Sequence, residues 1–147
     1  MFPIQNGVPH RSAPFVTWSL IATNVAVFLY QVSLSPPALD RFLVDYALIP
    51  GRYFVPLPFV PEPTLSDYLP FATNMFLHGG WLHLILNMWT LFLFGPTVED
   101  RMGGARYLLF YLFCGIAAST AHAYFNATSF VPALGASGAI AGVIGAF

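Results

Sequence analysis

Residues 68–98 read YLPFATNMFLHGGWLHLILNMWTLFLFGPTV, a stretch that contains no Asp, Glu, Lys or Arg. A transmembrane helix needs about 20 predominantly apolar residues to cross the hydrocarbon core of a bilayer. The stretch is long enough for one such helix, which we expect at about residues 72–94. His78, His83 and Asn87 lie within it. Polar and ionisable groups are costly at this depth, so these three residues are candidates for function.

Two further charge-free runs, 12–39 and 107–147, lie on either side of this stretch. They predict membrane helices at about 15–32 and 107–125, and, after a polar break containing Pro132, the start of a fourth helix at 137–147. That last segment would span about 16 Å at about 1.5 Å per residue, against a hydrocarbon core of about 30 Å. We therefore expect an all-α, polytopic helical bundle that continues beyond Phe147 in a longer protein.

The composition also indicates a chain that is surrounded mostly by lipid. Of the 147 residues 57% are hydrophobic and only 7% are charged, whereas soluble domains carry about 25% charged residues. The chain has no lysine and a net charge of −1, which excludes the basic surface of a nucleic-acid-binding protein. A single cysteine excludes an internal disulfide. We expect one membrane domain over 1–147, with the lipid bilayer as a partner and no nucleic acid.

Arginine placement predicts the orientation. The positive-inside rule places the side richer in Lys and Arg in the cytoplasm. With a cytoplasmic N-terminus, Arg11, Arg101 and Arg106 lie inside and Arg41 and Arg52 outside. This margin of one residue favours a cytoplasmic N-terminus, and a bacterial inner membrane is the default location. The first apolar segment is long for a signal peptide and no small-x-small cleavage site follows it, so we expect it to stay in place.

The connection 33–71 is extended and rich in proline. Four of its apolar residues follow the offsets 0, 3, 4 and 7 of one helical face: Leu39, Phe42, Leu43 and Tyr46. This pattern predicts a short amphipathic helix. The helix either lies in the membrane interface or packs against the bundle, and the sequence leaves both possibilities open.

The polar residues of the second span form the first motif. His83 and Asn87 are spaced i, i+4 and share one helical face. His78 lies five residues before His83, about 140° around an ideal helix, and points elsewhere unless the Gly79–Gly80 pair distorts the turn. The simplest alternative is that these side chains only join helices by hydrogen bonds. No carboxylate lies nearby in the sequence, so we expect no metal site.

A second motif, Gly135-Ala136-Ser137-Gly138, stands where the fourth helix begins. Glycine permits close backbone approach, and the first N–H groups of a helix have no partner within it. A serine at this position can thus meet a substrate carbonyl beside free N–H donors, as in an oxyanion hole. The alternative is packing alone, because Gly138 and Gly142 also form a small-xxx-small face.

Taken together, the motifs resemble those of the rhomboid family of intramembrane serine proteases. The resemblance is carried by His78-x4-His83-x3-Asn87, by Gly95, by Val98-Glu99-Asp100-Arg101 and by Gly135-Ala136-Ser137-Gly138, in that order. It extends over about residues 15–147. It implies a core of six membrane helices, of which this chain would supply the first three and the start of the fourth.

The resemblance also implies roles for the individual residues. Ser137 would be the nucleophile, and His83, Asn87 and the Ser137 N–H would stabilise the oxyanion. Supporting roles would fall to His78, Gly135, Gly138, Glu99 and Arg101. The substrates would be membrane-spanning proteins, and no cofactor is implied. We expect the polar faces of the second and fourth helices to line a water-accessible cavity.

Two features depart from the family pattern. The general base of the family is a histidine on the sixth helix, which would lie beyond Phe147, and His122 matches no motif position. No Trp-Arg pair occurs in 33–71. We therefore expect activity from the full-length protein and none from residues 1–147 alone. The alternatives are a catalytically inactive rhomboid-like protein that binds membrane clients, and a subunit of a channel or transporter. A histidine on a small-residue helix after Phe147 would favour the protease.

Overall fold

The computed structural model describes residues 12–56 and 64–147. These residues form no named strand, and their long elements are helices. Three helices are long and apolar enough to cross a membrane: α1 (Phe15–Ser33), α5 (Trp81–Met102) and α6 (Gly104–Phe125). A shorter apolar helix, α7 (Ser137–Ala146), follows. The prediction of an all-α, polytopic membrane protein is confirmed.

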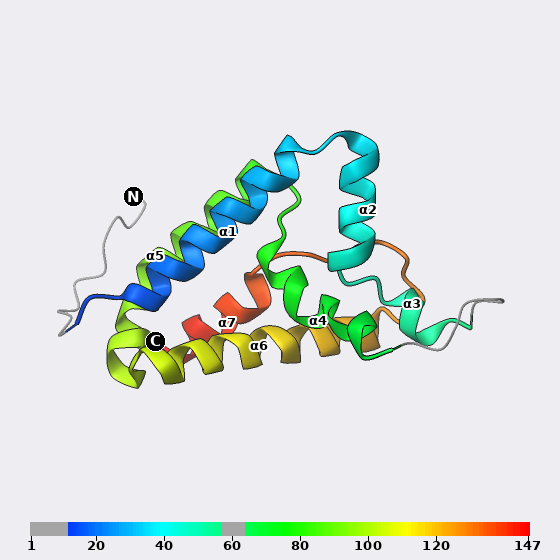
Figure 1. Cartoon of the computed structure of the whole chain (residues 1–147). Helices are drawn as coiled ribbons and strands as arrows, with labels where there is room; N and C mark the ends of the chain where they lie inside the picture. The colour runs from blue at the N-terminus through cyan, green and yellow to red at the C-terminus, as the bar shows by residue number, and fades with distance from the viewer. Residues whose placement is uncertain (1–11, 57–63) are drawn as a thin grey trace.

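The helices pack around a core of apolar residues from all four. Helices α1 and α5 lie side by side and antiparallel, and α7 lies close to α6 (Figure 1). A Cβ atom added to Gly138 would meet Ala118 of α6, and one added to Gly142 would lie 2.5 Å from the Cys114 Sγ atom. The small-residue face of α7 is therefore pressed against α6, as the sequence indicated.

The second membrane helix begins later than predicted. The expected span at about 72–94 is broken at its start into α4 (Pro70–Thr73) and the 3-10 turn η2 (Asn74–Phe76), and α5 begins only at Trp81. The cause is local. The Asn74 side-chain amide donates to the Phe71 carbonyl, and Gly80 adopts an extended conformation (φ 166°, ψ 169°) that no helix can contain. The prediction that the helix starts near residue 72 was therefore wrong.

The same helix also ends later than predicted. Residues 95–106, which lie between the helices predicted at 72–94 and 107–125, are helical except for Gly103, whose φ of 80° turns the chain from α5 into α6. Pro96 lies inside α5 and does not end it. Of the charged residues in this stretch, Glu99 and Asp100 lie near the end of α5, where they meet the residues at the start of α1.

The end of α5 caps the start of α1. The Glu99 carboxylate accepts hydrogen bonds from the Val16 N–H (2.9 Å), the Thr17 N–H (2.8 Å) and the Thr17 hydroxyl (2.7 Å). Beside it, the Asp100 carboxylate accepts two hydrogen bonds from Ser12. Negative charge at a helix N-terminus is favourable because the first N–H groups are unpaired and the helix dipole is positive there. Both oxygens of the buried Glu99 carboxylate therefore accept hydrogen bonds.

The connection 33–71 contains the predicted short helix, α2 (Pro36–Tyr46). Its Phe42 ring packs edge-on against Tyr30 at the end of α1, with the ring centroids 5.5 Å apart. No residue of α2 is fully buried. The helix therefore contacts the bundle through part of its apolar face and leaves the rest exposed.

Two further elements complete the connection, α3 (Gly51–Phe54) and the 3-10 turn η1 (Leu65–Tyr68). An isolated antiparallel bridge joins Leu48 to Ala133, and the Gly51 N–H donates to the Ser129 carbonyl at 2.7 Å. The connection is thereby fixed to the segment that precedes α7.

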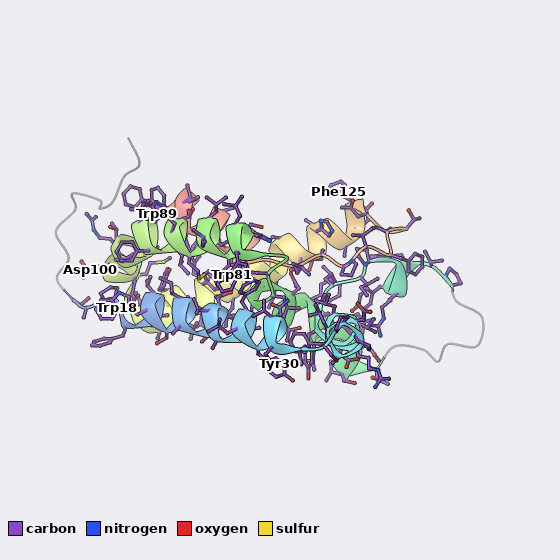
Figure 2. The ribbon with its side chains drawn as sticks, turned by 90° about the horizontal axis from the view of Figure 1, so that it is seen from above. Trp18, Tyr30, Trp81, Trp89, Asp100 and Phe125 are labelled. Carbon is purple, nitrogen blue, oxygen red and sulfur yellow. The ribbon has the colours of Figure 1, made fainter. Side chains whose placement is uncertain are left out.

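Large apolar side chains remain on the outside of the bundle. Figure 2 shows Trp18 towards the Asp100 end of the molecule, with Tyr30 and Phe125 towards the opposite end. Trp18 is 49% exposed and Phe125 is 81% exposed. Such a surface would aggregate in water but is suited to lipid, with aromatic residues near both interfaces.

Candidate active site

Ser137 is the first residue of α7 and is exposed. Ala136, which precedes it, is fully buried and anchors the start of the helix. The Ser137 N–H has no hydrogen-bond acceptor among the residues that the structure describes. The serine therefore combines an accessible hydroxyl with a free donor at the positive end of a helix.

Gly135 brings the loop before Ser137 onto helix α5. Its φ of +125° is a conformation that side chains rarely adopt, and its N–H donates to the Asn74 carbonyl at 2.9 Å. A Cβ atom added to Gly135 would lie 2.6 Å from the His83 Cε1 and Nε2 atoms and 3.7 Å from the Asn87 Nδ2 atom. The His83 ring therefore packs directly on the Gly135 backbone, two residues before Ser137.

Asn87 is held by His78. The Asn87 Nδ2 and His78 Nε2 atoms are 3.1 Å apart, and both residues are buried. The amide nitrogen is a donor, so the His78 Nε2 atom accepts and its proton resides on Nδ1. This bond uses one of the two N–H groups of Asn87 and leaves the second for another acceptor.

The glycine pair explains how His78 reaches Asn87. His78 lies in the extended segment before α5, outside the regular helix. The angle of about 140° between His78 and His83, which assumes an ideal helix, therefore does not apply. The His78 ring stands edge-on to the His83 ring, with the centroids 5.1 Å apart. All three polar residues of the motif are therefore neighbours.

His78 is neutral near pH 7. Burial and, to a smaller extent, the neighbouring His83 lower its pKa from 6.5 to about 4, while the Phe76 carbonyl acts in the opposite direction. A neutral ring can accept the Asn87 hydrogen bond, whereas a protonated ring would present donors on both nitrogens. Desolvation thus maintains the state that orients Asn87.

A cavity of about 470 Å³ adjoins Ser137. Its polar lining comes from Asn74, Ser119 and His122, in addition to Ser137. The fourth helix lines it as expected, and Asn74 and Met75 contribute from the predicted second span; α6 lines it too, whereas neither His83 nor Asn87 belongs to the lining. The reason is the close packing of α7 on α6, which puts this side of Ser137 next to α6.

Two polar residues near the site were missed in the sequence. The Asn74 amide donates to the Ser119 hydroxyl at 2.9 Å, while its backbone carbonyl receives the Gly135 N–H. Gln31 of α1 hydrogen-bonds the backbone of His78. Both residues are amides within apolar segments, and this could have marked them as candidates. Their partners could not have been predicted from the sequence.

The other predicted site residues lie elsewhere. Glu99 is at the far end of α5, against the start of α1, and the neighbouring Arg101 is exposed. Gly138 faces Ala118 of α6. Within residues 12–56 and 64–147, no group of three or more His, Cys, Asp or Glu side chains is placed to share a metal ion.

Comparison with known proteins gives a consistent result. The Rhomboid domain family matches residues 66–147. The chain is 43% identical over 81 residues to the rhomboid protease GluP of Bacillus subtilis, covering 55% of this chain and 15% of GluP. It is 27% identical over 144 residues to the rhomboid protease AarA of Providencia stuartii, covering 89% and 49% of the two chains.

A mitochondrial protein is also similar. The chain is 29% identical over 137 residues to Rhomboid protein 1 of Saccharomyces cerevisiae, covering 90% of this chain and 35% of the yeast protein. The chain thus spans less than half of the length of each of these three relatives.

Proposed function

Because the chain belongs to the rhomboid family, we propose that it forms part of an intramembrane serine endopeptidase that cleaves membrane-spanning proteins through Ser137. The observation that carries the proposal is the packing of the Gly135 backbone on His83, which joins the serine-bearing helix to the His83 and Asn87 face of α5. Relatives named as proteases support the same reaction class.

The proposed reaction is acyl transfer to serine. The Ser137 Oγ atom forms a bond to the carbonyl carbon of the scissile peptide, its proton passes to a general base, and the carbonyl oxygen becomes an oxyanion. The C–N bond then breaks, and the amine leaves with the proton. Water hydrolyses the acyl-enzyme by the same steps and regenerates Ser137.

Three donors would stabilise the oxyanion: the Ser137 N–H, the His83 ring and the second N–H of Asn87. Because the first Asn87 N–H is bound to His78, the amide nitrogen cannot turn away from the site without breaking a buried hydrogen bond. Removing one such donor typically lowers the rate about 10²–10³-fold.

We propose that the general base lies outside the residues that the structure describes. His83 is engaged beside Gly135, and His122 lies on α6, where its ring approaches the Asn126 amide. The resemblance to rhomboids places the base on a later helix, so the proposed activity is that of the full-length gene product. We expect residues 1–147 alone to be inactive.

In this proposal, water reaches Ser137 through the cavity beside it. The cavity beside the serine has room for several water molecules, and Asn74, Ser119 and His122 offer them hydrogen bonds. Polar groups at membrane depth are tolerated where they line such a cavity. The second half of the reaction would draw its water from there.

The chain is an integral membrane protein, and we propose a cytoplasmic N-terminus. Arg101 and Arg106 lie where α5 passes into α6, beside the start of α1, whereas α2 and α3, which carry Arg41 and Arg52, lie at the opposite end (Figure 1). Arg11 lies outside the described residues. We keep a bacterial inner membrane as the proposed location, although the relatives include bacterial and mitochondrial proteins.

A fluorophosphonate probe tests the proposal. The full-length gene product, purified in detergent, should be labelled, and the Ser137→Ala variant should not. Ser33→Ala is the matched control, because Ser33 is an exposed serine at the end of α1. Absence of labelling in a folded wild type would overturn the proposal and favour a catalytically inactive protein that binds membrane clients.

A further inference from the structure

Helix α1 carries three buried polar residues at intervals of seven: Thr17, Asn24 and Gln31. A spacing of seven keeps side chains on one stripe of a helix, here the stripe that faces the bundle. Thr17 bonds to Glu99, and Asn24 donates to the Leu20 carbonyl of its own helix. Gln31 differs because its partner, His78, belongs to the candidate active site.

The Gln31 amide forms two hydrogen bonds with one residue. Its Oε1 atom accepts from the His78 N–H at 3.1 Å, and its Nε2 atom donates to the His78 carbonyl at 3.2 Å. Gln31 is 4% exposed and His78 is 2% exposed. His78 lies in an extended segment where no helical ladder pairs its backbone, so Gln31 satisfies both groups that would otherwise be buried without a partner.

The two bonds connect α1 to the residues around Ser137. Gln31 holds the His78 backbone, the His78 ring accepts from the Asn87 amide, and that amide faces Gly135. The segment is followed by Gly79 and Gly80, which restrict the backbone little. Without the Gln31 bonds, the His78 ring would lose the anchor that sets its distance from Asn87.

We propose that Gln31 is a positioning residue of the protease site: by clamping the His78 backbone, it keeps the Asn87 amide directed at the loop that presents Ser137. This inference rests on the proposed function for its effect on activity. Gln31 itself does not touch the reacting atoms.

The kinetic test uses full-length protein in detergent and the rate of fluorophosphonate labelling. We expect Gln31→Leu to lower the maximal labelling rate about 10–100-fold with little change in the half-saturating probe concentration, since a displaced oxyanion donor costs up to about 10²–10³-fold. Asn24→Leu is the control, because Asn24 is equally buried on the same stripe and does not contact the site. It should stay within about threefold of wild type. Equal effects of the two variants would overturn the inference.

Gln31→Glu provides a conservative rescue. Protonated, the carboxyl group can accept from the His78 N–H and donate to its carbonyl, whereas the ionised group can only accept. The labelling rate of this variant, taken relative to wild type at each pH, should therefore rise as the pH falls. The Gln31→Leu ratio should stay flat. If the labelling rate relative to wild type is independent of pH for both variants, the proposed role of Gln31 is contradicted.

A second readout does not depend on activity. In ¹⁵N-histidine-labelled protein, the wild-type His78 Nε2 nitrogen should give the signal of a hydrogen-bonded, unprotonated nitrogen. In Gln31→Leu this signal should shift or broaden, while in Asn24→Leu it should not. If the probe never labels the wild type, the proposed function is wrong. The His78 signal alone then tests whether Gln31 positions His78. An unchanged His78 signal in Gln31→Leu overturns that positioning role.

Discussion

Replacing Gly135 with alanine tests the contact that joins α7 to α5. The new Cβ would lie 2.6 Å from the His83 Cε1 and Nε2 atoms, and the residue would have to adopt a φ of +125°. Backbone strain of this kind costs about 1–3 kcal/mol, and overpacking a tight contact costs about another 1–3 kcal/mol. We therefore expect Gly135→Ala to lower the free energy of unfolding by about 2–6 kcal/mol.

The measurement is denaturant or thermal unfolding in mild detergent, with Gly80→Ala as the control. Gly80 has open space around its Cβ position and an extended φ of 166°, so alanine fits there. A double variant separates the two contributions. Adding His83→Ala to Gly135→Ala removes the clash and leaves the strain, so the two substitutions should be non-additive by about 1–3 kcal/mol. Equal stability of Gly135→Ala and Gly80→Ala, or simple additivity, would refute the reasoning.

Three further outcomes are expected in the same unfolding assay. Glu99→Gln should destabilise by about 1–3 kcal/mol, because an amide N–H would face the donors of Thr17; the exposed Asp45→Asn should have no comparable effect. His78 has a pKa of about 4 in the folded protein, against an ordinary value of 6.5. The unfolded state therefore binds the proton first, and stability should fall by about 1.4 kcal/mol per pH unit from pH 6.5 down to 4 and then level off; a His78→Gln variant should lack this part of the slope. Gly142→Ala should destabilise by about 1–3 kcal/mol through its clash with the Cys114 Sγ and Cβ atoms; adding Cys114→Ala should relieve it only in part, because the Cβ atom at 2.7 Å remains.

The membrane segments could be predicted from the sequence because their cause is compositional. Charge-free runs long enough to cross a bilayer can only be helices in lipid, where each backbone group must be paired within its own segment. Three spans were therefore found, and the start of the fourth helix at Ser137 agrees with α7. The family was also visible in the sequence, and the Rhomboid domain match over residues 66–147 confirms it.

The ends of the second span could not be predicted from charge alone. The extended backbone at Gly80 starts α5 nine residues later than expected, and Pro96 does not stop it. Charge marks where the hydrocarbon core ends, while a helix can continue into the interface. It does so here because Glu99 finds its partners on α1.

The sequence by itself selected the residues that we propose to carry the chemistry. The i, i+4 spacing of His83 and Asn87 and the glycines around Ser137 are local patterns, and local patterns follow from helix geometry and glycine's conformational freedom. The tertiary structure decided what supports them. Gln31 lies 47 residues from His78, and Asn74 lies 45 residues from Ser119. Each pairing exists because segments distant in sequence are packed together, and a buried amide without a partner is costly.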